Sequence, residues 1–155
     1  MKSIFAILFA AVLVAACASE ETPKPTPVAA CKPAPSELET KDLKPGTGDT
    51  VRFRSAVLVS YTGWLYDGCA KDLKGAMFDT SEGRPTPFGF IVGAGRVIRG
   101  WDEGVIGMKE GGTRLLVIPS DKGYGARGSP PKIPPNAPLV FEVTLVKIIQ
   151  QPPAQ

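Results

Sequence analysis

Only one segment of this 155-residue chain, residues 97–106, has the apolar spacing of a helix. Its apolar residues fall on one face of that helix: Val97, Ile98, Trp101 and Val105. Gly100 and Gly104 lie beside this face, although glycine costs a helix about 1 kcal/mol relative to alanine. Their presence indicates that another element packs very close to the helix. A chain with one short helix and a closely packed tryptophan must take most of its remaining structure from strands.

The other patterned segments show the alternation of strands. In SAVLVSYTGWL, residues 55–65, the side chains of Val57, Val59 and Tyr61 share one face, which directs Tyr61 inward. Further extended segments are predicted at residues 76–81, 85–93, 113–119 and 138–149. A turn is indicated at Asp67-Gly68, and a polar surface loop at residues 69–75. The length and the 43% hydrophobic content predict one folded domain with one core.

The composition limits the chemistry more than any motif does. The chain contains no histidine, which excludes serine or cysteine catalysis that relies on imidazole, a histidine-ligated zinc and a histidine pH switch. The net charge is +3, and the Lys and Arg residues are scattered, without the basic cluster interleaved with aromatics that nucleic-acid-binding proteins use. We therefore expect no cofactor, no metal and no nucleic-acid partner.

The beginning of the chain resembles a bacterial lipoprotein precursor. Lys2 precedes an apolar run, residues 4–16, that is too short to span a bilayer comfortably. The small residues before Cys17 resemble a lipobox, which implies that residues 1–16 are a signal peptide and that Cys17 is diacylated. At about 0.8 kcal/mol per buried methylene, two or more acyl chains give a stable membrane anchor. The alternatives are a plain signal peptide cleaved nearby and a buried apolar helix.

A linker is predicted over residues 17–35, between this anchor and the domain. It is rich in Pro, Thr, Ala and Glu and has no periodic apolar pattern, which is typical of a polyproline-like spacer. At roughly 3.1 Å per residue it reaches on the order of 50 Å. The folded domain is predicted over residues 36–150, with a tail at 151–155.

If Cys17 is acylated, Cys31 and Cys69 remain as an even pair in an exported, oxidising setting. Two alternatives stay open. The two residues form a disulfide that pins the linker against a loop of the domain, or they are separate thiols. The sequence does not decide between them, because a disulfide depends on the geometry of the fold.

Five motifs occur in order along the chain: YTGWL, FDTS, PFGFIVGAGRVIRGWDEGVIGMKEGG, IPSDKGYGARG and IPPNAPLVFEVTLVKI. Together they closely resemble the FKBP-type peptidyl-prolyl cis-trans isomerases, the macrolide-binding immunophilins, over about residues 50–149. The resemblance implies an α+β fold in which a twisted antiparallel β-sheet wraps around one short α-helix. It also implies a shallow aromatic pocket between the sheet and the helix.

The resemblance further implies which residues form that pocket: Tyr61, Phe78, Asp79, Phe88, Val97, Ile98, Trp101, Tyr124, Ile133 and Phe141. In the family the tryptophan is the floor beneath the bound proline ring, so Trp101 would belong to both the core and the active site. The residues alone leave a second interpretation, in which Trp101 only fills the core. The Ile98 N–H and the Tyr124 hydroxyl are the expected donors to the peptide carbonyls, and Asp79 and Arg84 are expected to pair at the rim.

The implied activity is rotation about X-Pro bonds in exported proteins, which needs no nucleophile, proton transfer or metal to lower a barrier of about 18–20 kcal/mol. The implied partners are proline-containing polypeptides and macrolide inhibitors. The alternative function is a holdase chaperone or host-interaction module that uses the same pocket. We expect a monomer, lipid-anchored in the cell envelope at the outer membrane and facing the periplasm, because Ala18 is not the aspartate that retains many lipoproteins at the inner membrane.

Two lysines depart from the common family pattern. Lys122 stands before Gly123-Tyr124 and Lys132 before Ile133, where a small or apolar residue is more usual. We hypothesise that they favour acidic residues near the client proline. The loop at residues 69–75 also lengthens the segment after YTGWLYDG.

Two other signals are rejected as functional motifs. Residues 93–98 begin like a dinucleotide fingerprint, but Ile98 stands where a glycine is required and the parallel βαβ context is missing. Asp102 and Glu103 are adjacent on a helix and cannot face each other across a substrate, so we interpret both as a solvated edge.

Overall fold

The computed structural model describes residues 31–150 of the chain. The predicted signal peptide at residues 1–16, Cys17, the linker up to residue 30 and the tail at 151–155 lie outside the described residues.

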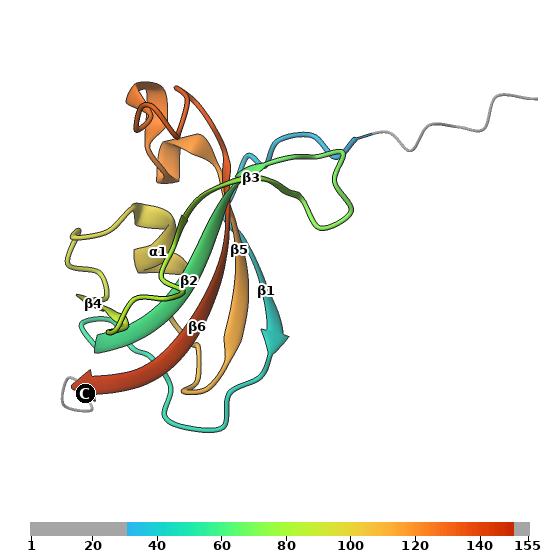
Figure 1. Cartoon of the computed structure of the whole chain (residues 1–155). Helices are drawn as coiled ribbons and strands as arrows, with labels where there is room; N and C mark the ends of the chain where they lie inside the picture. Colours follow the sequence, from blue (N-terminus) through green and yellow to red (C-terminus); the bar gives the residue numbers. More distant parts are fainter. Residues whose placement is uncertain (1–30, 151–155) are drawn as a thin grey trace, which may run out of the picture.

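The described residues form one antiparallel sheet and one short α-helix (Figure 1). The elements in chain order are β1 (Glu39–Lys44), β2 (Ala56–Tyr66), β3 (Lys74–Thr80), β4 (Phe88–Ile91), α1 (Arg99–Gly104), β5 (Thr113–Ile118) and β6 (Leu139–Gln150). Two 3-10 helices, η1 (Ser120–Lys122) and η2 (Gly125–Arg127), lie between β5 and β6. The strand order is β1-β5-β6-β2-β3, and β4 pairs with the first half of β2. The predicted fold class is confirmed.

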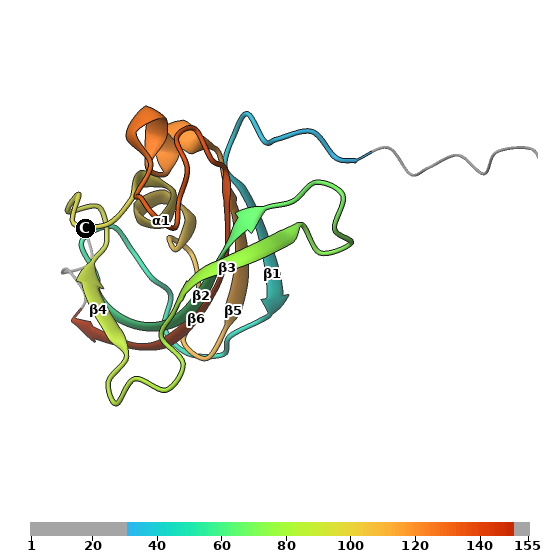
Figure 2. The ribbon, with the colours of Figure 1, turned by 45° about the horizontal axis from the view of Figure 1, so that its top comes forward.

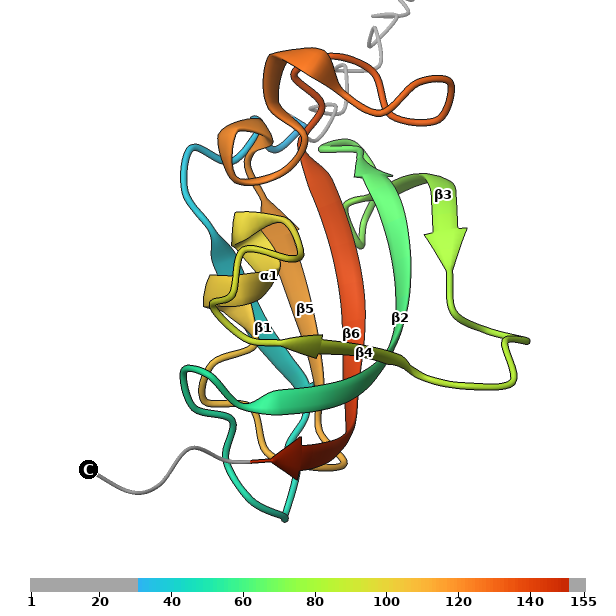
Figure 3. The ribbon, with the colours of Figure 1, turned by 90° about the vertical axis from the view of Figure 1, so that its left-hand side faces the viewer.

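The sheet curls around α1, which lies against its concave face (Figure 3). Alternation along the strands sends every second side chain toward the helix, as in Val57, Val59, Leu116, Ile118, Val143 and Leu145, none of which is exposed. The two helix glycines explain how closely the layers approach. A Cβ atom on Gly100 would lie 2.5 Å from Ile118 Cγ2, and one on Gly104 would lie 2.8 Å from Leu116 Cδ2.

Two elements differ from the sequence-based prediction. The helix runs from Arg99 to Gly104, so Val97 and Ile98 precede it instead of forming its first turn. Strand β1, with the sequence ETKDLK, was not predicted, because all six of its residues are exposed and show no apolar alternation. It is a strand only because it pairs along β5.

A disulfide joins Cys31 to Cys69, with 4.3 Å between the two Cα atoms. The pairing ties residues 31–38 to the loop between β2 and β3, and Figures 1 and 2 both show these two segments side by side. The Lys32 N–H also donates to the Gly68 carbonyl at 2.8 Å, and the Tyr66 hydroxyl contacts the carbonyls of Lys32 and Pro33. Of the two alternatives for the cysteines, the structure has the disulfide.

Candidate active site

A cavity of about 170 Å³ opens between α1 and the concave face of the sheet. It is lined by Tyr61, Phe78, Asp79, Phe88, Arg96, Val97, Ile98, Trp101, Tyr124 and Phe141. Nine of the ten predicted pocket residues are in this lining. The tenth, Ile133, lines a neighbouring cavity of about 320 Å³ that shares Phe78, Asp79 and Tyr124 with the first. Arg96 was not predicted to line the pocket, and only its position directly before the predicted pocket residue Val97 could have indicated it.

Trp101 forms the apolar floor of this pocket and is only 4% exposed. Its ring meets three aromatic walls edge to face, with centroid distances of 4.9 Å to Tyr61, 5.3 Å to Phe141 and 5.9 Å to Phe88. Such edge-to-face pairs are each worth about 0.5–1.5 kcal/mol beyond the area they bury. The Trp101 Nε1–H is buried and has no hydrogen-bond partner among residues 31–150. The floor is therefore rigid and apolar, with one donor left unused.

The loop that brings Val97 and Ile98 to the pocket is held by Asp102. Its carboxylate accepts hydrogen bonds from the backbone N–H groups of Gly93 at 2.8 Å and Gly95 at 3.0 Å. Both glycines have a positive φ, which favours glycine over other residues. The interpretation of Asp102 as a solvated residue is therefore wrong, because the side chain is half-buried and anchors the loop.

The rim of the pocket is a hydrogen-bonded group of three side chains. The Tyr61 hydroxyl donates to Asp79 Oδ2 at 2.7 Å, and Arg84 Nη2 donates to Asp79 Oδ1 at 2.7 Å. The expected pairing of Asp79 and Arg84 is thus present. Burial, and then the hydrogen bond to the Asp79 carboxylate, raises the pKa of Tyr61 above its usual value. These contacts fix the tilt of the Tyr61 ring against Trp101.

Two groups that line the pocket have no acceptor within residues 31–150. The Ile98 N–H precedes the helix and makes no backbone hydrogen bond there. The Tyr124 hydroxyl makes no side-chain hydrogen bond, and residue Tyr124 as a whole is 40% exposed. A tyrosine titrates near 10 and is a donor at neutral pH; burial, and then the charge of Asp79, raises the pKa of Tyr124 further. These are the two groups that the sequence predicts as donors to a bound peptide.

The two unusual lysines have different surroundings. The Lys122 ammonium forms an ion pair with the Glu103 carboxylate of α1, which also contacts Arg99. Lys132 donates to the Phe78 carbonyl at 3.0 Å and forms no ion pair in the described part of the chain. Of the two lysines, only Lys132 lacks an ion pair with another described residue, as does Arg96 in the lining of the pocket.

The described residues contain no group of acidic, cysteine or histidine side chains that could hold a metal ion. Between residues 31 and 150 there is also no helix of the length and hydropathy needed to cross a membrane. What the pocket offers is an apolar floor, fixed aromatic walls and donors for carbonyl oxygens. Such a site can hold a small ring and change the conformation of an adjacent amide without forming a covalent bond.

The sequence family and known relatives agree with this geometry. Residues 44–146 match the family described as FKBP-type peptidyl-prolyl cis-trans isomerase. The chain is 47% identical over 113 residues to the FK506-binding protein of Neisseria meningitidis serogroup A, covering 73% of this chain and 97% of that protein. It is 56% identical over 88 residues to peptidyl-prolyl cis-trans isomerase FKBP2 of Mus musculus, covering 57% of this chain and 58% of that protein.

A solved structure shows the same fold. The crystal structure of FkpA from Escherichia coli aligns with a TM-score of 0.62 and 36% sequence identity, over 74% of this chain and 49% of that chain. Residues 31–150 thus form an aromatic pocket with unpaired donors, and this chain belongs to the FKBP-type peptidyl-prolyl cis-trans isomerases. It is accordingly an enzyme that interconverts the cis and trans forms of X-Pro bonds.

Proposed function

We propose that this isomerase acts on exported proteins and stabilises the twisted X-Pro amide without covalent chemistry. One observation carries the mechanism. The pocket combines the buried floor of Trp101 with two unpaired donors, the Ile98 N–H and the Tyr124 hydroxyl. We propose that a proline ring lies on this floor and that the adjoining peptide carbonyls accept hydrogen bonds from those donors.

The aromatic walls lower the barrier by acting on the amide itself. Rotation costs about 18–20 kcal/mol because the twisted state loses amide resonance. A planar amide is strongly solvated, and an apolar pocket removes that solvation while the donors bind carbonyl oxygens in the twisted geometry. No titrating catalyst is needed, which agrees with a chain that contains no histidine.

Binding of the ground state is expected to be weak. A proline ring that buries on the order of 100 Å² gains about 2.5 kcal/mol at ~25 cal/mol/Å². A millimolar complex requires about 4.1 kcal/mol. The pocket alone therefore recognises little beyond the proline and should accept many client sequences.

The activity is tested by following cis-to-trans isomerisation of a short Xaa-Pro-Phe peptide. We expect acceleration by the wild-type protein and a loss in Phe141→Tyr and Asp79→Ala variants that retain their fold by circular dichroism. A folded wild-type protein that does not accelerate the reaction would favour the binding module instead.

The proposed location is the cell envelope, with Cys17 diacylated and the domain facing the periplasm from the outer membrane. The Cys31–Cys69 disulfide supports export, because disulfides persist in oxidising compartments. Metabolic labelling with a fatty acid, followed by membrane fractionation, tests the anchor. Label that persists in Cys17→Ser, or protein that remains in the soluble fraction, would contradict it.

Macrolide binding and the monomeric state complete the proposal. The support for a macrolide is the aromatic pocket, together with relatives named for binding FK506. Titration of the wild-type isomerase activity with FK506 tests it: saturable inhibition is the expected result, and full activity at high FK506 concentration would contradict it. Sedimentation equilibrium tests the monomer.

A further inference from the structure

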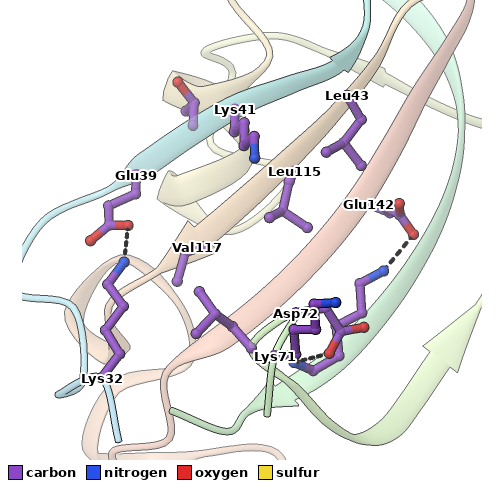
Figure 4. A pocket seen from close by; sticks show the side chains of 12 residues that line it. Lys32, Glu39, Lys41, Leu43, Lys71, Asp72, Leu115, Val117 and Glu142 are labelled. Carbon is purple, nitrogen blue, oxygen red and sulfur yellow. Dashed lines mark hydrogen bonds and ion pairs between the residues drawn. The ribbon is translucent and has the colours of Figure 1, made fainter. Parts of the chain in front are cut away.

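A second cavity, of about 790 Å³, lies on the convex face of the sheet, away from the aromatic pocket (Figure 4). Leu116 and Ile118 of β5 point toward the helix glycines, so the alternate residues Leu115 and Val117 point to the other face. These two, with Leu43 of β1 and Leu73 of the β2–β3 loop, make its floor apolar. We call this cavity the outer groove.

The walls of the outer groove are held in place by several contacts. One wall includes Lys32, beside the disulfide that joins Cys31 to Cys69, and the other is formed by loop residues 71–73 and Lys74, the first residue of β3. The Asp72 carboxylate of this loop accepts a hydrogen bond from the Lys74 N–H at the start of β3, at 3.3 Å. The lengthened loop and the cross-linked N-terminal segment form the walls of the outer groove and contribute no residue to the lining of the aromatic pocket.

The charges around the outer groove are partly neutralised. Lys32 pairs with Glu39 at 2.6 Å, and a dashed line joins these two side chains in Figure 4. Lys74 pairs with Glu142 at 2.9 Å. Lys41 and Lys71 form no ion pair with any residue between 31 and 150. Asp72, which lines the same groove, forms no ion pair with a described residue either, so four lysines face Glu39, Asp72 and Glu142, a net charge of +1. This excess of positive charge beside an apolar floor suits an occupant with both apolar side chains and carboxylates.

We propose that the outer groove binds an extended segment of an unfolded polypeptide that has apolar side chains at alternate residues and carboxylates beside them. Leu115 and Val117 are two residues apart on β5, a spacing of roughly 6.6–6.8 Å in a strand. An extended peptide repeats its side chains at the same spacing, so successive apolar side chains can lie along this floor. Its carboxylates would meet Lys41 and Lys71.

This binding deepens the proposed function by adding a second contact for long clients. A client held in the outer groove is tethered to the enzyme, which raises the local concentration of its proline at the aromatic pocket. A tetrapeptide is too short to contact both faces of the sheet. The outer groove should therefore lower the KM for unfolded proteins and leave the kcat/KM for tetrapeptides unchanged.

The first test measures binding alone. Labelled ten-residue peptides without proline, in which Leu alternates with Glu, are titrated with the full-length protein and followed by fluorescence anisotropy. The comparison peptide has the same composition with its Leu residues adjacent. We expect the alternating peptide to bind at least about fivefold more tightly, and the double variant Lys41→Glu/Lys71→Glu to remove that difference. Equal binding of the two peptides overturns the proposal.

The second test compares two substrates. The variants are Lys41→Glu/Lys71→Glu and, as a control of equal charge change, Lys109→Glu/Lys147→Glu, whose side chains lie outside the outer groove. We expect the first variant alone to raise the KM for the refolding of a proline-limited protein by about fivefold or more. Both should isomerise a tetrapeptide at the wild-type rate. An equal rise in the two variants, or none, contradicts the proposal.

The two tests separate this inference from the isomerase function. If the wild-type protein did not isomerise a tetrapeptide, the proposed function would fail, while the anisotropy titration would still show whether the outer groove binds a polypeptide.

Vesicles that contain an anionic lipid provide the last comparison. The protein could bind these vesicles through Lys41 and Lys71 and not bind the alternating peptide. That result would assign the outer groove to a lipid surface and overturn the proposal that it binds a polypeptide.

Discussion

One tryptophan lies against each face of the sheet, Trp101 from α1 and Trp64 from β2, and the two differ in what surrounds them. Trp101 on the concave face contacts aromatic rings, and its Nε1–H has no partner in the described residues. Trp64 on β2 lies under the Lys74 ammonium, 4.3 Å from its ring centroid, and Lys74 is itself paired with Glu142. The concave face thus keeps donors unpaired inside a fixed apolar frame, whereas most charges of the convex face pair with one another. The two faces therefore offer different groups to a ligand: uncharged donors in an aromatic frame on the concave face, and unpaired charges beside apolar side chains in the outer groove of the convex face.

The largest expected effect comes from removing each tryptophan in turn. Trp101→Ala should cost about 3–5 kcal/mol of unfolding free energy, because it leaves a cavity among Tyr61, Phe88 and Phe141. It should also abolish isomerisation. Trp64→Ala should destabilise less, because its ring is only half-buried, and should keep kcat/KM for a tetrapeptide. Urea denaturation and the peptide assay measure both.

The contrast between the two faces would be lost if Trp64→Ala reduced activity as much as Trp101→Ala at equal folded fraction. Trp101→Phe serves as the intermediate variant, because it restores most of the volume. It should recover more stability than activity if the indole has a role beyond filling the core.

The fold could be read from the sequence wherever one side of an element is buried. Apolar side chains alternate at Val57, Val59 and Tyr61 because one face of β2 packs in the core. The helix glycines, Gly100 and Gly104, predicted the close packing that they make with Ile118 and Leu116. Strand β1 could not be found, since its six exposed residues carry no such pattern and its pairing with β5 is a long-range event.

The site could be read mainly through family resemblance. Motif order placed the ten pocket residues, and the fold brings nine to one cavity and Ile133 to its neighbour. The resemblance did not predict the anchoring role of Asp102, because its partners are backbone N–H groups of Gly93 and Gly95, which sequence patterns do not display. It also could not tell that Glu103 neutralises Lys122 and leaves Lys132 unpaired.

Neutralising one carboxylate on each face should produce the next largest difference. Asp79→Asn removes the charged acceptor of Tyr61 and the partner of Arg84. Because this ion pair is more than one third exposed, we expect a loss of about 1 kcal/mol, or about fivefold in kcat/KM. Glu142→Gln breaks the equivalent pair with Lys74 on the convex face and should leave the tetrapeptide rate unchanged. Similar losses in both variants would mean that the rim has no special role.

A smaller effect, on the free energy of unfolding, should appear at high pH and should arise from two tyrosines on the concave side of the sheet. The pKa values of Tyr61 and Tyr124 are raised in the folded protein, whereas an unfolded tyrosine titrates near 10. Just above pH 10 the folded state therefore retains protons that the unfolded state releases. The contribution of these tyrosines to the free energy of unfolding is fully present below about pH 10. It falls as the pH rises through their pKa values in the folded protein, by at most about 1.4 kcal/mol per pH unit for each tyrosine.

Urea denaturation between pH 8 and 11 measures this slope. Tyr61→Phe and Tyr124→Phe should each flatten it relative to the wild type. An unchanged slope in both variants would show that the two hydroxyls lie in more solvated surroundings than the pocket provides.

The smallest predicted effect concerns the two lysines beside the pocket. Lys132 has an unneutralised charge and contacts the Phe78 carbonyl, whereas Glu103 neutralises Lys122. A peptide with Glu before the proline should therefore react about two- to fivefold faster than one with Lys, in line with an exposed ion pair worth about 0.4–1 kcal/mol. Lys132→Met should remove this preference and Lys122→Met should retain it, as kcat/KM for the Glu-Pro and Lys-Pro peptides would show. Equal rates for the two peptides, or the same loss in both variants, would mean that ion pairing with Glu103 is not what separates the two lysines.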